Sequence, residues 1–260
     1  MIGRKFRPSS TLIACLVVFA TSPIAAQEVE ESDVQAWFQY QYQHRVSESI
    51  RGSWGLGYRD LISTEDELAD WSRLHFIGDF VYSHSRRVSF EGGFGGYYTF
   101  AGELSDLWEL RTWQGAIVFW PAFKLAGRQI DLRHRFRLEQ RWTNQRDGGD
   151  SEFGLRFRYR LASFIPLTKQ TIENGSFYVP LMGETFSDLG DDSLDYFAAR
   201  LRLTVGVGYV FNDYWTLEFR YTAQQSRDQV LNRFKTDDHI LDFRIRTAVL
   251  IRDLLSPSGD

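Results

Sequence analysis

Hydrophobic and polar residues alternate with a period of two along much of this chain. Between residues 197 and 209 every odd position is apolar, and the even positions include Arg200 and Arg202. Between residues 130 and 142 the odd positions instead form an unbroken charged series, which consists of Asp131, Arg133, Arg135, Arg137, Glu139 and Arg141. Successive side chains of a β-strand point to opposite faces, so this period predicts strands with one apolar and one polar face.

Eleven such strands are predicted, with no convincing amphipathic helix. They lie at about 34–44, 48–59, 71–83, 86–100, 107–120, 130–142, 153–161, 176–186, 197–209, 215–223 and 238–251. Strands of soluble proteins typically have about five or six residues, whereas two of these sustain the pattern for about fifteen. Fifteen residues tilted by about 40° rise close to 38 Å, which exceeds the apolar band of about 25 Å of a membrane barrel. We therefore predict an all-β protein, a single transmembrane antiparallel up-and-down β-barrel; a soluble periplasmic β-protein is the alternative.

Aromatic residues gather toward both ends of the predicted strands, as Trp108 and Trp120 do. Such rings prefer the headgroup level of a bilayer. An arginine on the lipid-facing side of a barrel costs about 2–4 kcal/mol at the midplane, so the charged faces are expected to line the lumen. The predicted polar network of the lumen comprises Arg133, Arg135, Arg137, Glu139, Arg141, Arg156, Arg158, Arg160, Glu184, Arg200, Arg202, Glu218, Arg220, Asp242 and Arg244.

The connections suggest an up-and-down order. Residues 211–214 (Phe-Asn-Asp-Tyr) predict a tight hairpin, and longer polar connections follow every second strand. Closed bacterial barrels usually have an even number of strands, so ten or twelve are expected. An even number requires either a further strand near 27–33 or one error among the eleven.

The first 26 residues have the pattern of a secretory signal peptide, with three basic residues, an apolar stretch and a small-residue exit. The barrel domain is then expected over 27–260, with a net charge that changes from −4 to −7. Cys15 lies in the signal, which excludes a disulfide scaffold and a cysteine-based zinc site. An acidic exported chain is a poor candidate for nucleic-acid binding. Its 26 arginines against 4 lysines favour fixed, forked hydrogen bonds.

The arginine series permits two interpretations. It forms a structural Arg–carboxylate network if lumenal acids neutralise most of it, or a basic constriction for anions if they do not. An enzyme acting on lipid or lipopolysaccharide is a further alternative, and residues 83–85 (Ser-His-Ser) are the only place where hydroxyls flank a histidine. His134 falls on the lipid-facing register. The acidic segments 147–152 and 188–195 match no calcium-loop spacing, so no metal and no cofactor are expected.

Several segments together resemble a family of outer-membrane barrels catalogued as domain of unknown function 2490. They are 134–141, 156–161, 184–186, 200–221 and the strand that begins at His239. The resemblance extends over about 34–250 and implies a single-domain barrel in the outer membrane with no established activity. One departure is the end of the chain, 254–260, which extends beyond the last strand, whereas many such barrels end on an aromatic residue that the assembly machinery recognises.

These observations predict an exported protein of a bacterial outer membrane, most simply a structural or narrow-pore barrel with an arginine-rich polar lumen. The expected partners are the lipid bilayer with its lipopolysaccharide, the outer-membrane assembly machinery and a small anionic solute.

Overall fold

A computed structural model describes residues 32–64, 70–102, 105–148, 151–189, 200–228 and 233–250. The predicted signal peptide, most of the segment 27–33 and the chain end at 254–260 lie outside these residues. The described part contains no helix of the length and apolarity that crosses membranes.

Twelve strands form in the described residues, and eleven of them coincide with the predicted strands. Their bounds are β1 Asp33–Arg45, β2 Ile50–Ser63, β3 Ser72–Ser83, β4 Val88–Phe100, β5 Leu107–Phe119, β6 Phe123–Leu125, β7 Arg128–Gln145, β8 Glu152–Pro166, β9 Ser176–Leu189, β10 Arg200–Val210, β11 Trp215–Asp228 and β12 Arg233–Leu250. The additional strand, β6, has three residues and pairs only with the beginning of β7. The other strands have 11 to 18 residues, long enough for a tilted strand to cross a bilayer.

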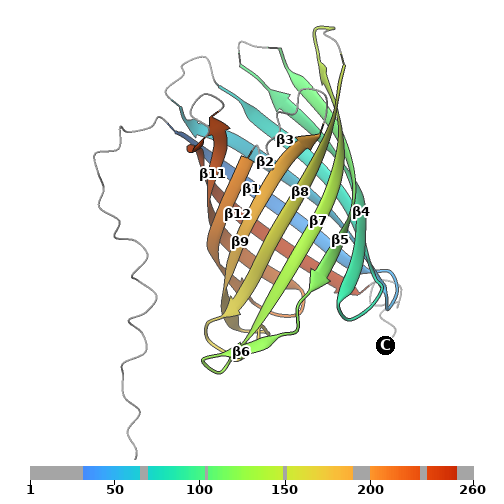
Figure 1. Ribbon diagram of the computed structural model, residues 1–260, viewed down its shortest axis with the longest axis vertical. Coiled ribbons are helices and arrows are strands. Elements are labelled where there is room, and N and C mark those ends of the chain that lie inside the picture. Colours follow the sequence, from blue (N-terminus) through green and yellow to red (C-terminus); the bar gives the residue numbers. More distant parts are fainter. Residues whose placement is uncertain are drawn as a thin grey trace, which may run out of the picture. The chain divides into compact units, whose positions relative to one another are not determined.

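Eleven strands close into a barrel (Figure 1). Each strand from β1 to β5 pairs antiparallel with the next, β5 pairs with β7, and the antiparallel series continues from β7 to β12. The barrel closes between β1 and β12, which pair in parallel from Asp33↔Asp238 to Arg45↔Leu250. The closed all-β barrel is confirmed, but the expected even number of strands is wrong. An odd number is possible because the first and last strands run in the same direction and still complete each other's hydrogen bonds.

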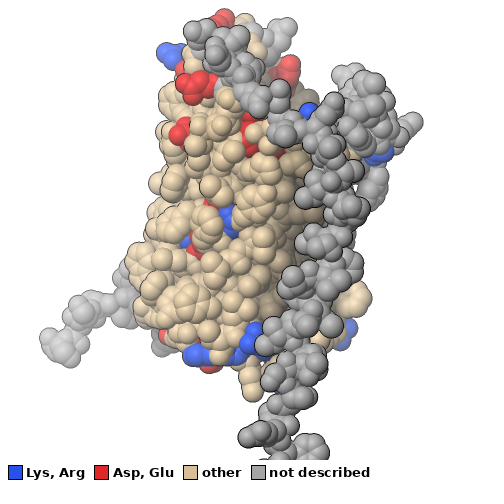
Figure 2. All heavy atoms as spheres, turned by 90° about the vertical axis from the view of Figure 1, so that its left-hand side faces the viewer, with Lys and Arg blue, Asp and Glu red and all other residues tan. Residues whose placement is uncertain are grey.

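The two faces of the wall differ as the alternation predicts. Large apolar side chains lie exposed on the outside, for example Phe38 with 53% and Leu203 with 52% of their surface accessible. Figure 2 shows a broad uncharged zone between rims that carry charged residues, with only a few charged atoms visible within it. So large an exposed apolar surface is unfavourable in water and favours a lipid-embedded wall over a soluble β-protein.

Aromatic rings pack against one another near both ends of the wall. Trp142 contacts Phe153 at the rim where β7 ends, with ring centroids 5.3 Å apart. At the opposite rim Tyr209 contacts Phe211, with centroids 4.6 Å apart. Histidine takes part as well, since His134 Nδ1 lies 2.8 Å from the Tyr159 hydroxyl on the outer face. Rings with a polar edge suit the boundary between lipid and water.

The tight hairpin between β10 and β11 also forms as predicted. The side-chain oxygen of Asn212 accepts hydrogen bonds from the backbone N–H groups of Tyr214 and Trp215, at 2.9 and 3.0 Å. Asparagine stabilises such turns because its short side chain satisfies backbone donors two and three residues ahead.

Neighbouring substitutions on β10 test the assignment of the faces. We expect Leu203→Arg to impair barrel assembly, at a cost of about 2–4 kcal/mol, because its charge would point into lipid. Thr204→Arg is expected to assemble, because Thr204 lines the lumen and contacts only Thr222 through its hydroxyl, at 2.7 Å. The heat-modifiable, compact band on gels of membrane fractions measures assembly. Equal assembly of the two variants would contradict the assignment.

Cysteine pairs test the parallel closure between β1 and β12. Val34 pairs with His239, and Phe38 pairs with Phe243. Double cysteine variants of these pairs are expected to form disulfides on mild oxidation, because paired residues lie close enough for an S–S bond. The exchanged pairs, Val34 with Phe243 and Phe38 with His239, are expected to remain reduced, since four residues separate them by about 13 Å along the strands. Disulfides in the exchanged pairs alone would indicate antiparallel closure.

Candidate functional site in the barrel lumen

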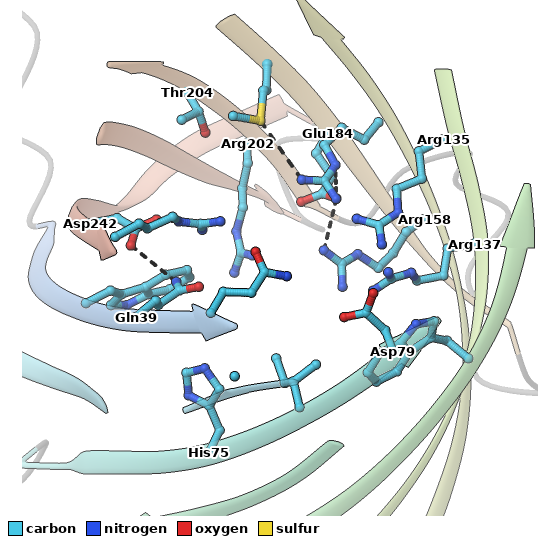
Figure 3. A pocket seen from close by; sticks show the side chains of 18 of the residues that line it. Gln39, His75, Asp79, Arg135, Arg137, Arg158, Glu184, Arg202, Thr204 and Asp242 are labelled. Atoms are coloured by element: carbon cyan, nitrogen blue, oxygen red, sulfur yellow. Dashed lines mark hydrogen bonds and ion pairs between the residues drawn. The ribbon is translucent and has the colours of Figure 1, made fainter. Parts of the chain in front are cut away.

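A cavity of about 770 Å³ occupies the barrel lumen. Its lining includes Asp188 and Arg200 at one end of their strands and Gln43 and Phe164 toward the opposite rim, so the cavity runs along most of the wall. The close-up in Figure 3 shows side chains from opposite sides of the wall pointing into it, with Arg202 reaching toward the middle.

Fourteen of the fifteen residues predicted for the lumen line this cavity. They are Arg133, Arg135, Arg137, Glu139, Arg141, Arg156, Arg158, Arg160, Glu184, Arg200, Arg202, Arg220, Asp242 and Arg244. The fifteenth, Glu218, is 1% exposed and pairs with Arg220 and with Arg246. The structure thus brings the whole set to the inner face.

Carboxylates bridge the arginines of β7 and β8. Glu139 is 1% exposed and receives Arg156 Nη2 at 2.6 Å and Arg158 Nη1 at 2.5 Å. Glu91 on β4 receives Arg135 Nη2 at 2.5 Å and Arg137 Nε at 2.8 Å. Charge-assisted bonds of this kind are strong, and together they fix the guanidinium planes.

Further carboxylates bind arginines around the wall. Glu184 lies 2.9 Å from Arg158 Nη2 and 3.5 Å from Arg160 Nε. On β5, Glu109 binds Arg111 at 2.6 Å and also binds Arg141. Because these carboxylates are buried and shared, the network is a structural part of the barrel.

The arginines nevertheless outnumber the acids. Fifteen arginines and six carboxylates line the cavity. Even with Glu109, Glu218 and Asp238, which are buried in the same inner face, six positive charges remain in excess when all groups are ionised. Five of the lining arginines form no ion pair with a carboxylate of the described residues, namely Arg59, Arg73, Arg133, Arg200 and Arg202. The acids expected to neutralise the series therefore do so for most of β7 and β8 but not for the whole lumen.

Aromatic rings inside the lumen hold several of these cations. Arg59 lies over the Trp37 ring, 3.9 Å from its centroid, and Arg202 lies 5.3 Å from the same ring. Arg111 lies 4.0 Å from the centroid of Tyr97. Contacts of this kind stabilise a desolvated cation by about 0.5–2 kcal/mol. The rings thus compensate part of the burial cost without removing any charge.

The sequence-based prediction missed the lumenal arginines and aromatic rings of β1 to β5. Arg59 and the inward ring of Tyr97 lie on the glycine-rich strands β2 and β4, where the alternation is weaker. Arg73 and Arg111 are single arginines on β3 and β5, without the repeated series that marks β7 and β8. The alternation on β2 does indicate that Arg59 points inward. Arg59 and Gly57 lie on the same face of the strand, and the residue between them, Tyr58, points outward. Gly57 itself leaves space for a lumenal ring, since a Cβ there would lie 2.1 Å from His75.

The segment Ser83-His84-Ser85 forms the turn after β3. The Ser85 hydroxyl accepts the backbone N–H groups of Arg87 and Val88, at 3.3 and 3.1 Å. His84 packs between Tyr82 and Phe90, with ring centroids about 6 Å away. No side chain in the described part of the chain hydrogen-bonds to its ring, so these contacts explain the segment as a capped turn.

Metal ligands do not converge within the described residues, where no three His, Cys, Asp or Glu side chains lie close enough to share an ion. The predicted acidic segments 147–152 and 188–195 fall partly outside those residues.

Residues 34–235 match the model of a family described as proteins of unknown function, DUF2490. The chain belongs to the DUF2490 family. The resemblance predicted from the sequence is thereby confirmed. No curated protein matches the chain. A solved structure with a similar fold is LpxR from Salmonella typhimurium, which is 9% identical, with a TM-score of 0.46 over 77% of this chain and 83% of that chain. This DUF2490 barrel must therefore be interpreted from its own lumen.

Removal of the Glu139 carboxylate tests the buried network. We expect Glu139→Gln to lower the free energy of unfolding by about 3–5 kcal/mol, because Arg156 and Arg158 lose a buried partner. Urea unfolding in lipid vesicles, followed by tryptophan fluorescence, measures the change.

Glu173→Gln is the matched control for that variant. Glu173 lies in the turn after β8, is 57% exposed at its side chain and forms an ion pair with Lys169 at 3.1 Å. Exposed pairs contribute about 0–1 kcal/mol, so its unfolding midpoint should stay near that of the unmodified protein. Equal effects of the two substitutions would show that the lumenal network does not stabilise the barrel.

Proposed function

We propose that this protein is an outer-membrane barrel that admits small anions into a positively charged lumen. The observation that carries the proposal is the excess of arginine over carboxylate along a cavity of about 770 Å³ that extends over most of the wall. Rings of charged side chains select ions of the opposite sign, and low-dielectric walls strengthen their field.

The outer face of the wall supports a location in a membrane. A closed barrel satisfies every backbone hydrogen bond of its wall, which is the condition for crossing a bilayer with strands. The exposed apolar residues of the wall and the aromatic pairs near both rims suit such a surrounding. The predicted signal peptide supports export to the bacterial outer membrane, with lipopolysaccharide and the assembly machinery as partners.

The lumen combines ion-paired arginines with other polar side chains. Arginines bound to Glu139, Glu91 and Glu184 are held in place by ion pairs. The opposite wall adds further arginines, such as Arg59 and Arg244, and neutral groups such as Gln41, which donates to Ser53 at 3.2 Å. An anion in the lumen therefore meets arginines on both sides, with neutral hydrogen-bonding groups between them.

Conductance in planar bilayers tests the proposal. We expect a steady current whose reversal potential in a potassium chloride gradient indicates preference for chloride. Arg202→Glu is expected to reduce this preference, because the variant changes the lumenal charge by two at the centre of the cavity. Arg86→Glu makes the same change of charge in the exposed turn after β3 and should retain the preference. Cation selectivity, or no current from correctly folded protein, would contradict the proposed passage of anions.

A further inference from the structure

Two arginines of the lumen occupy directly paired positions on neighbouring strands and share no acid. Arg59 on β2 and Arg73 on β3 are direct partners in the antiparallel register, and both line the cavity. Like charges in directly opposed positions destabilise a pair of strands. No carboxylate of the described residues forms an ion pair with either one. The pair therefore lacks the counter-charge that its position requires.

Other arginine pairs in the same wall have that counter-charge. Arg137 and Arg158 are register partners, and Glu139 lies 3.8 Å from the first and 2.5 Å from the second. Arg111 and Arg141 are register partners as well, and Glu109 binds both. In both of these pairs, one shared carboxylate compensates the repulsion between two arginines. Between Arg59 and Arg73 no carboxylate of the described residues takes this position.

A third arginine reaches the same place from β10. Arg202 and Arg59 both lie over the ring of Trp37, at 5.3 and 3.9 Å from its centroid. Figure 3 shows Arg202 extending into the middle of the cavity, on the side toward His75. Arg202 and Arg59 therefore meet at one ring, and Arg73 joins them through its register with Arg59.

Neutral acceptors anchor two of these groups through Nε. Arg73 Nε donates to the Thr99 hydroxyl at 2.6 Å, and Arg202 Nε donates to the Gln224 side-chain oxygen at 2.7 Å. The Nε of Arg59 is buried and has no hydrogen-bond partner among the described residues, while its guanidinium lies on Trp37. No hydrogen bond within the described residues uses the terminal nitrogens of these three side chains. Their forks remain available to a ligand.

We propose that Arg59, Arg73 and Arg202 form a binding site for a phosphate-type oxyanion, either free or carried by a small solute. Guanidinium forks match the oxygen atoms of such a group two at a time. Trp37 and the stacked pair of His75 and Tyr97, with centroids 5.4 Å apart, flank the site, so the rest of a solute would lie against the edges of these rings. The inference rests on the positively charged lumen of the proposed function and names its ligand class.

Calorimetric titration of the folded protein in detergent micelles tests the site with three probes: inorganic phosphate, glucose 6-phosphate and glucose. Both phosphate-bearing probes are expected to bind, and glucose is not. Arg59→Gln, Arg73→Gln and Arg202→Gln should each weaken binding by about tenfold or more, since each removes a charge-assisted hydrogen bond. Arg86→Gln, in the exposed turn after β3, should bind like the unmodified protein.

The two phosphate probes distinguish the sources of the oxyanion. Equal affinities would identify a site for the free ion, whereas tighter binding of glucose 6-phosphate would indicate that the flanking rings contact a solute. Absence of phosphate binding, equal binding of glucose, or unchanged affinity in all three arginine variants would overturn the proposal.

An internal carboxylate provides a second test that keeps all three arginines. Thr99→Asp places an acid next to Arg73, where the Thr99 hydroxyl now accepts its Nε–H. This variant is expected to lose phosphate binding and to unfold at a higher temperature than the unmodified protein. Retained phosphate affinity in a folded Thr99→Asp protein would place the bound ion elsewhere.

The outcomes separate this site from the proposed function. Phosphate binding without any current would support the site and contradict the passage of anions. Anion-selective current without phosphate binding would support the passage and overturn the site.

Discussion

The unfavourable free energy of a guanidinium group in lipid is the constraint on which this structure depends. Residues 133, 135 and 137 follow one another at a spacing of two, so all three point to the same side of β7. That side has to be wet or ion-paired, and the opposite side then faces outward with residues such as Phe136. Paired residues of neighbouring strands point to the same face of the sheet, so the orientation of β7 also determines which residues of its neighbours point inward.

Enclosing so many cations creates a second requirement, because each buried charge needs compensation. The barrel meets it in three ways: with shared carboxylates such as Glu139, with lumenal rings such as Trp37, and with neutral acceptors such as Thr99. Only the first of these removes charge. A lumen stabilised partly by the other two retains a net positive potential, and this potential links the stability of the wall to its proposed affinity for anions.

Most of the wall was predictable from the sequence, because strand positions and faces are local properties. The unbroken charged series of β7 and the apolar series of β10 each define a strand and its faces without reference to any other segment. All eleven strands that the alternation predicts form in the barrel, but the even number of strands expected for closure is wrong. Closure depends on the pairing of β1 with β12, which are separated by almost the whole chain, and no local pattern records whether that pairing is parallel.

The partners of the lumenal charges were beyond sequence reasoning for a related reason. Glu91 on β4 binds Arg135 on β7, although β5 lies between their strands in the wall. Such contacts depend on strand tilt and stagger, which the alternation does not encode. The same holds for Arg59 and Arg73, whose opposition follows from the register of β2 with β3. The three-dimensional structure is therefore needed to identify the arginines that have no carboxylate partner.

The central claim is the division of the wall into a lipid face and a wet face, and accessibility along β10 tests it most directly. Single spin labels at positions 202, 203, 204, 205 and 207, in protein reconstituted into vesicles, report collisions with oxygen in lipid and with a polar nickel chelate in water. The structure predicts high oxygen accessibility at Leu203, Val205 and Val207 and higher chelate accessibility at Arg202 and Thr204, which line the lumen. Uniform values along the strand, or the inverse alternation, would contradict the account.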